Sequence, residues 1–257
     1  MGLGVLVIIA GLIIFLFYIP SLRITKVAIA GLGSVDEKNL RAEVLAALDS
    51  RRFLVLPRDH LLFFPKNEVE ELLNHKFRVR TFELSKDFPS SISIQINARE
   101  TWAVWCPASG RVDCLLLDKD GLGFEKARDF AGTAVLKIID ARDDDFLGKK
   151  ILEHDKLIKL QEMISDIPGK AGDELSTINI KASGETYLLY LRSGWYLLID
   201  EDIDPRTALE NLTIVLKSEI KEKKNDLEYI DLRFRDKVFY KFKNAESVEE
   251  PPTEYSI

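Results

Sequence analysis

Two acidic segments contain the residue types of a divalent-cation site. Asp118, Asp120 and Gly121 have the spacing that opens a calcium-binding loop, and Ca²⁺ prefers carboxylate oxygens as ligands. The glutamate that would close such a loop is missing, so the pattern favours a simple Asp-Gly turn. Residues 143–145 are three consecutive aspartates, which we interpret as a solvated acidic loop.

The other residue types used in catalysis and metal binding form no recognisable motif. His60, His75 and His154 are scattered without metal-ligand spacing, and the surface is their expected position. The chain has no glycine-rich phosphate loop, no nucleophile elbow and no His-Glu-x-x-His motif. Its formal net charge of −6 argues against nucleic acid as the main partner. The sequence therefore predicts a non-enzymatic protein with no cofactor, metal, small-molecule substrate or nucleic acid.

Cys106 and Cys114 flank a short segment centred on Ser109 and Gly110. If this segment is a hairpin, the two cysteines face each other across it and can form a disulfide, which suits an oxidising compartment. The alternative is a pair of free thiols in adjacent strands, and the sequence leaves both interpretations open.

The first residues of the chain have the composition of a membrane segment. Residues 3–19 are all apolar or glycine except Tyr18, and as a helix they would be roughly 25 Å long, close to the thickness of a bilayer's hydrocarbon core. A buried core helix and a cleaved signal peptide are the alternatives. We favour an uncleaved transmembrane anchor at residues 1–21, in contact with lipid through residues 3–19. The flanking charges, Arg23 and Lys26, do not settle its orientation.

Two regions with different patterns of expected helices and strands follow the anchor, and together they predict an α+β protein. Residues 22–98 have a strand-helix-helix-strand-strand pattern, and residues 99–242 are rich in strands and contain two helices. The expected elements of the first region are a strand at 22–30, helices that begin at Ser34 and Pro65, and strands at 77–84 and 92–96. The helices of the second region are expected at about 149–167, stopped by Pro168, and at 204–222.

A terminal hairpin is the segment best suited to bind a partner. Residues 229–234 alternate between apolar and polar side chains, residues 235–237 can turn the chain, and residues 238–242 alternate again. A last strand without a neighbour exposes backbone donors and acceptors. Lysines then either guard this edge, or a partner's strand is added to it. Residues 243–257 are acidic and contain Pro251-Pro252, and we expect them to be disordered.

Several short motifs, in this order after an apolar segment, resemble the FtsQ/DivIB family of bacterial cell-division proteins. The motifs are Ile24-x-x-Val27-x-Ile29-x-Gly31, Phe88-Pro89-x-x-Ile92-x-Ile94-x-Ile96, Arg99 with Ala103-x-Trp105, Leu117-Asp118-x-x-Gly121, and Tyr229-Ile230-Asp231-Leu232-Arg233-Phe234. The chain departs from the family at Ala98, where a glutamate is usual, and at Thr101, where a proline is usual.

The resemblance implies a single-pass protein of the cytoplasmic membrane, with a POTRA domain at 22–98 and a β-rich domain at 99–242. The bulk of the chain would lie outside the cytoplasm at the division septum. Its partners would be FtsB-like and FtsL-like single-pass proteins, bound at the last strand by β-augmentation. The contact residues expected from the hairpin and the resemblance are Phe234, Val238, Phe239, Tyr240 and Phe242. The alternative functions are a POTRA-containing binding module of envelope assembly or secretion, and an envelope hydrolase.

Overall fold

The chain divides into two compact units. The computed structural model describes residues 20–33, 36–49, 51–52, 56–57, 59–110, 113–127, 135–142, 144–243 and 253–256. Unit 1 is Met1–Arg99 and unit 2 is Glu100–Ile257. The division falls one residue after the expected boundary between 98 and 99.

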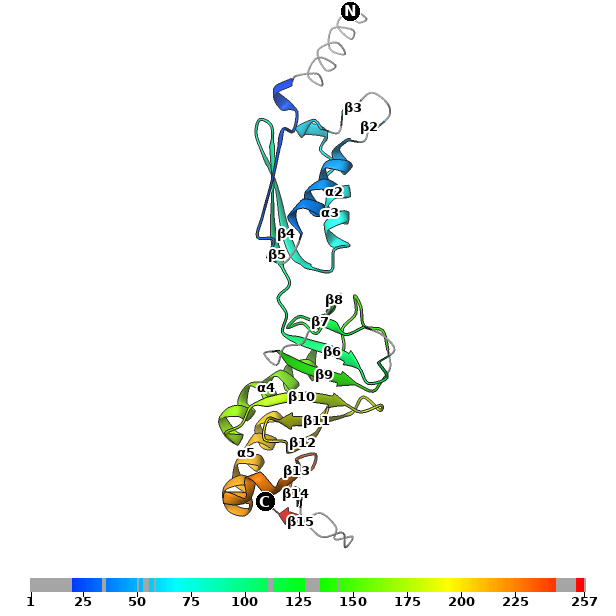
Figure 1. The fold of residues 1–257 in the computed structure, drawn as a ribbon. Coiled ribbons are helices and arrows are strands. Elements are labelled where there is room, and N and C mark those ends of the chain that lie inside the picture. The colour runs from blue at the N-terminus through cyan, green and yellow to red at the C-terminus, as the bar shows by residue number, and fades with distance from the viewer. Residues whose placement is uncertain are drawn as a thin grey trace, which may run out of the picture. The chain divides into compact units, whose positions relative to one another are not determined.

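Unit 1 is a three-stranded sheet with two helices on one side (Figure 1). β5 (Ser91–Ala98) is the central strand; β1 (Lys26–Ala30) is parallel to it and β4 (Val79–Asp87) is antiparallel. α2 (Glu37–Asp49) and α3 (Lys66–Asn74) lie between β1 and β4 in the sequence. The short elements are η1 (Pro20–Leu22), β2 (Arg51–Arg52), β3 (Leu56–Pro57) and η2 (Leu61–Phe63).

The alternating isoleucines of β5 form the core of unit 1. Ile92, Ile94 and Ile96 are buried, because every second side chain of a strand points to the same face. They belong to one apolar cluster with Val44 of α2 and Leu73 of α3. The two helices therefore bury one face of the small sheet.

Unit 2 is built on a ten-stranded mixed sheet with the order β15-β14-β13-β12-β11-β10-β9-β6-β7-β8. From β10 to β15, each strand lies beside the strand that precedes it in the sequence. The pairs β6–β9, β9–β10 and β12–β13 are parallel, and the other pairs are antiparallel. The strands are β6 (Ala103–Pro107), β7 (Leu115–Leu117), β8 (Gly123–Lys126), β9 (Leu136–Asp140), β10 (Leu175–Ile180), β11 (Thr186–Leu191), β12 (Tyr196–Asp200), β13 (Leu227–Asp231), β14 (Lys237–Phe242) and β15 (Thr253–Ser256).

Two helices lie on the same side of this sheet (Figure 1). They are α4 (His154–Ala171) and α5 (Pro205–Val215), and α5 continues into a π-helical turn (Leu216–Ile220) and a 3-10 segment (Lys221–Asp226). Leu160 of α4 and Leu212 of α5 are buried in one cluster with Ile178, Leu189 and Leu197 of the sheet. This cluster is the core that supports the terminal hairpin.

Helix α4 is displaced from the expected span of 149–167. Ile151 is buried before the helix starts, and its N–H donates a hydrogen bond to the carbonyl oxygen of Gly121 at 3.0 Å. The helix also continues through Pro168 to Ala171, and the residue after it, Gly172, has a φ of 61°, the left-handed value typical of a helix C-terminus. The apolar residues before position 154 thus belong to a buried loop.

The expected fold class is correct in its α+β character and wrong in its membrane helix. No helix in the part of the chain that the structure describes is long and apolar enough to cross a membrane. The longest of these, α4 with 18 residues, carries charged side chains from Asp155 to Lys170. Residues 1–19, on which the expectation of an anchor at 1–21 and of lipid contact through 3–19 rested, lie outside the described residues.

The acidic tail also differs from the expectation of disorder. Residues 253–256 form β15, which pairs antiparallel with β14. Residues 244–252 and 257 lie outside the described residues. β15 makes the C-terminal segment part of the sheet.

Candidate partner-binding site

The terminal hairpin consists of β13 and β14, but its first strand is shorter than expected. β13 ends at Asp231, which lies opposite Phe239 of β14. Leu232 is still buried, and its N–H donates a hydrogen bond of 2.9 Å to β12. The chain then turns through residues 233–236. Phe234 therefore lies in the turn and not on the core side of a strand.

The apolar side chains of β14 are divided between two faces. Val238 and Tyr240 are buried in the core of unit 2. Phe242 lies on the same face and packs against this core, with its ring centroid 5.7 Å from that of Tyr240. Phe239 lies on the opposite face and is half-buried. Of the expected contact residues, Val238, Tyr240 and Phe242 therefore support the sheet from its core side.

Phe234 and Phe239 form a pair of aromatic rings, named here the aromatic corner. Their ring centroids are 5.2 Å apart and their planes meet at 75°, the edge-to-face arrangement that aromatic pairs prefer. Phe234 is 46% exposed, and the guanidinium of Arg233 lies 5.8 Å from its ring centroid. Exposed aromatic and arginine side chains are the types that most often dominate the binding energy of interfaces.

An ion pair fixes the base of the aromatic corner. Arg233 donates to the carboxylate of Asp231 through Nε at 2.9 Å and through Nη2 at 2.6 Å. Asp231 is buried, so this two-point contact supplies the charge partner that a buried carboxylate needs. The hydrogen bond to Asp231 raises the pKa of Arg233 further. The arginine is thus a fixed positive charge beside Phe234.

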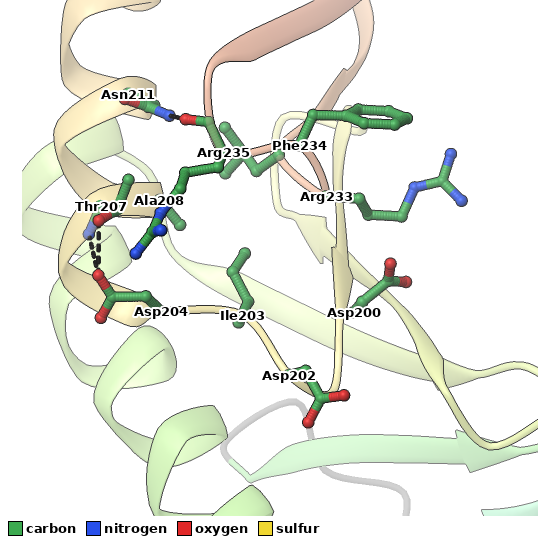
Figure 2. A pocket seen from close by; sticks show the side chains of 11 residues that line it. Asp200, Asp202, Ile203, Asp204, Thr207, Ala208, Asn211, Arg233, Phe234 and Arg235 are labelled. Carbon is green, nitrogen blue, oxygen red and sulfur yellow. Dashed lines mark hydrogen bonds between the residues drawn. The ribbon is translucent and has the colours of Figure 1, made fainter.

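A pocket of about 270 Å³ lies beside the aromatic corner (Figure 2). The Nδ2 atom of Asn211, on α5, donates a hydrogen bond to the carbonyl oxygen of Arg235 in the turn. Figure 2 shows the pocket between this helix, the loop before it and the turn. The lining residues are Asp200, Asp202, Ile203, Asp204, Thr207, Ala208, Asn211, Leu232, Arg233, Phe234 and Arg235.

Two of the three aspartates that line this pocket accept hydrogen bonds within the fold. Asp204 caps α5: it accepts hydrogen bonds from the N–H of Thr207 at 3.4 Å and from its hydroxyl at 2.5 Å, and these bonds lower the pKa of Asp204. Asp200 accepts from the hydroxyl of Thr186 at 2.9 Å. Across the described ranges, no group of three or more His, Cys, Asp or Glu side chains is arranged to hold a metal ion. With both signs of charge at its rim, the pocket suits a polar side chain of a bound peptide.

Sequence reasoning missed a row of tyrosines on the same face of the sheet as Phe239. Tyr190 of β11 lies opposite Tyr196 of β12, and Tyr196 lies opposite Tyr229 of β13. Their ring centroids are separated by 5.0 Å and 5.5 Å. Burial raises the pKa of both Tyr196 and Tyr229. Each tyrosine is visible in its strand pattern, but only the strand register brings the three together.

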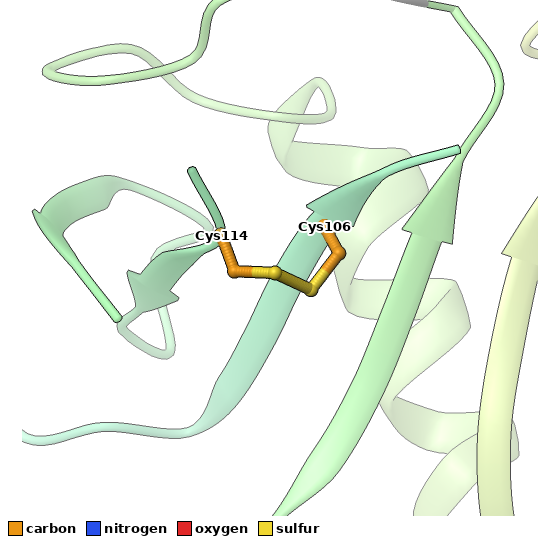
Figure 3. Close-up of a disulfide and its surroundings, with 2 residues drawn as sticks. All are labelled: Cys106 and Cys114. Carbon is orange, nitrogen blue, oxygen red and sulfur yellow. A yellow bond between two sulfur atoms is a disulfide. The ribbon is translucent and has the colours of Figure 1, made fainter. Parts of the chain in front are cut away.

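The two cysteines of the chain form a disulfide (Figure 3). Cys106 lies in β6 and Cys114 lies just before β7, the antiparallel neighbour of β6. Their Cα atoms are 4.3 Å apart. The bond crosses the hairpin between these strands, within unit 2.

Two of the earlier candidates for metal binding, Asp118 and His60, have structural roles. Asp118 forms a turn, in which its Oδ1 atom accepts from the N–H groups of Asp120 at 3.0 Å and Leu122 at 2.9 Å. His60, which was expected at the surface, is fully buried, and its Nδ1 atom accepts from the N–H of Leu62 at 3.4 Å. Of the acidic run 143–145, residue 143 lies outside the described residues.

Comparison with known proteins adds no assignment. No protein-family model matches the chain, and no curated protein matches it.

Proposed function

We propose that this chain is a non-enzymatic scaffold that binds another protein at the β13–β14 end of unit 2. The observation that carries the proposal is the aromatic corner, where an exposed phenylalanine packs on Phe239 beside a fixed arginine and a pocket. This combination supplies an aromatic anchor, a charge and a recess at one place. Truncation of such an anchor residue typically weakens binding by about 2 kcal/mol or more.

The proposed mode of binding is β-augmentation along β14. A partner's extended segment would form main-chain hydrogen bonds with this strand, and its side chains would reach Phe234, Phe239 and the adjacent pocket. Because side chains alternate along a strand, Phe239 is the β14 phenylalanine that contacts Phe234. Main-chain pairing would supply affinity, and the aromatic corner would supply specificity.

We further propose the division machinery as the setting, with FtsB-like and FtsL-like proteins as partners. The resemblance of residues 229–234 to the FtsQ/DivIB motif supports this assignment, as does the strand-helix-helix-strand-strand order of unit 1. Within the motif, Ile230 and Leu232 are buried, Asp231 pairs with Arg233, and Phe234 is exposed. The disulfide favours an oxidising compartment, consistent with a location outside the cytoplasm at the septum.

The test is capture of the same bacterium's FtsB-like and FtsL-like proteins by the full chain and by single variants. Phe234→Ala and Phe239→Ala should each weaken capture at least about tenfold while the chain remains folded by circular dichroism. Phe77→Ala is the matched control, because Phe77 is 45% exposed but belongs to unit 1. Its capture should equal that of the unchanged protein.

Two outcomes would contradict the proposal. Equal capture by Phe234→Ala, Phe239→Ala and the unchanged chain would remove the aromatic corner from the interface. No capture by the well-folded, unchanged chain would exclude the division partners and favour the alternative, a binding module of envelope assembly or secretion.

A further inference from the structure

The outer edge of β14 is already occupied by the chain itself. β15 lies antiparallel to β14 on the side away from β13. The paired residues are Lys237 with Ser256, Val238 with Tyr255, Phe239 with Glu254, and Tyr240 with Thr253. A second strand cannot use the same backbone groups at the same time, so partner binding along this edge requires that β15 leave.

Three features of the C-terminal segment suit a strand that is held but can be displaced. First, its charge is opposite to that of the edge: β14 contains Lys237 and Lys241, whereas residues 243–257 contain Glu246, Glu249, Glu250 and Glu254. Second, the segment is tethered to β14 through residues 244–252, and a short tether gives an effective concentration on the order of millimolar. Third, β15 has only four residues, so it forms few hydrogen bonds.

The sequence also limits how far β15 can extend along β14. Residues 251 and 252, which precede it, are both prolines and have no N–H to donate to a ladder. The register that the structure describes ends at Tyr240 with Thr253, and Lys241 and Phe242 of β14 lie beyond it. An incoming strand can therefore begin to pair at this end and replace β15 one residue at a time.

We propose that β15 is a built-in occupant of the docking edge that an extended, acidic segment of the partner replaces. An extended, acidic segment is expected because β15 itself is acidic and pairs through its backbone. The inference rests on the proposed function of β14 as the docking edge. In this arrangement the chain guards its own edge strand against unspecific pairing until the right segment competes for it.

The first experiment tests β15 without the partner. Hydrogen exchange of residues 237–242 is measured in the full chain and in a chain that ends at Lys243. Exchange of the amides on the outer edge should be about tenfold faster in the shortened chain. A synthetic peptide of residues 244–257, added to the shortened chain, should bind saturably, restore this protection and bind more weakly at high salt. Equal exchange in both chains, or no binding of the peptide, overturns the inference.

Two proline variants separate the loss of β15–β14 hydrogen bonds from the loss of the C-terminal residues themselves. Neighbouring residues of a strand point their N–H groups in opposite directions, so only one of Glu254→Pro and Tyr255→Pro removes a ladder donor. In one variant, the amides of β14 should exchange as fast as in the shortened chain. In the other, their exchange should be closer to that of the unchanged chain. If both variants showed the same exchange rate, between those of the unchanged and the shortened chain, the pairing of β15 with β14 would be contradicted.

The second experiment adds the FtsB-like protein as the probe. If β15 is paired about nine-tenths of the time, removal of residues 244–257 should tighten binding about tenfold. Suppose that β15 protects the β14 amides but that its removal leaves binding of the FtsB-like protein unchanged or weaker. The partner then does not replace β15, whereas the proposed docking site is not contradicted. No binding by either chain, again with protection present, overturns the proposed function and, with it, the partner exchange.

Discussion

The side-chain amide of Asn211 donates a hydrogen bond to the carbonyl oxygen of Arg235, with Nδ2 and the oxygen 3.1 Å apart. This contact joins helix α5 to the turn that carries Phe234. Asn211 is buried, so water does not compete well for the bond. The position of the exposed phenylalanine thus depends on a helix that belongs to the core of unit 2.

Asn211→Ala should release this turn. The carbonyl oxygen of Arg235 loses its partner, and we expect the free energy of unfolding to fall by about 1–2 kcal/mol. Amide exchange in residues 232–236 should accelerate. Ile214→Ala is the control, because Ile214 lies on the same helix and is 39% exposed. Unchanged exchange in the turn of Asn211→Ala would show that the bond does not hold it.

Phe242→Lys should destabilise the protein more than Phe239→Lys. Phe242 packs on the core face of β14, and a lysine there places a charge against apolar side chains. We expect the free energy of unfolding to fall by about 1–3 kcal/mol, measured by urea denaturation with circular dichroism. Phe239 lies on the other face, where a lysine can reach solvent, so its replacement should affect partner binding more than stability. The reverse order would show that the two faces are assigned incorrectly.

Reduction of the disulfide should loosen the β6–β7 hairpin. Cys106 and Cys114 are separated by 8 positions, and closing a loop of that length stabilises a folded chain by about 2–3 kcal/mol in the chain-entropy model. The midpoint of urea denaturation should therefore decrease when dithiothreitol is added. The double variant Cys106→Ser with Cys114→Ser should match the reduced protein and should not respond to the reductant. If dithiothreitol also lowered the denaturation midpoint of the double variant, the reductant would be acting on something other than this disulfide.

The stability of unit 2 should decrease at alkaline pH through Tyr187. Burial and, to a lesser extent, the negative charge of Glu201 raise the pKa of Tyr187 from 10.0 to about 12. The neutral phenol is thus favoured in the folded state. Its stabilising contribution is complete below pH 10 and is lost as the pH rises towards 12, because the unfolded chain releases this proton first. The decrease in unfolding free energy between pH 10 and 12 should be smaller in Tyr187→Phe, measured by denaturation at each pH. An identical decrease in both chains would contradict the shift.

The parts of the fold that follow from local pattern were predictable. Ile92, Ile94 and Ile96 alternate with polar residues, and they form a strand with one buried face. The helix that follows Asp204 could be expected from its capping residue and the proline after it. In both cases, the signal lies within a few neighbouring residues.

The parts that depend on tertiary contacts could not be predicted. Pro168 normally ends a helix, yet α4 passes through it, because packing of the apolar side of α4 outweighs local preference. Before and within β15, glutamates and two prolines suggest disorder, yet residues 253–256 form a strand that pairs with β14. Alternation alone also assigns Phe234 to the core face, because the pattern does not show that β13 ends at Asp231.

The candidate site was predictable as a segment but not as a surface. The terminal hairpin contains Phe234 and Phe239, but their contact depends on the length of the turn. The pocket requires α5, which precedes the hairpin in the sequence, and the tyrosine row requires the register of β11, β12 and β13. These relationships join residues that are far apart in the chain, and a single sequence carries no direct signal for them.

The order of strands in unit 2 bears on the stage of folding at which β14 can form. Because each strand from β10 to β15 pairs with its predecessor, the sheet can grow in one direction, and β14 has no template until β12 and β13 are in place. If β14 is the docking edge, as proposed, a chain whose sheet has not yet assembled cannot present it. Under the proposed function, a partner would therefore be recruited only by a molecule whose sheet has assembled, without any separate checkpoint.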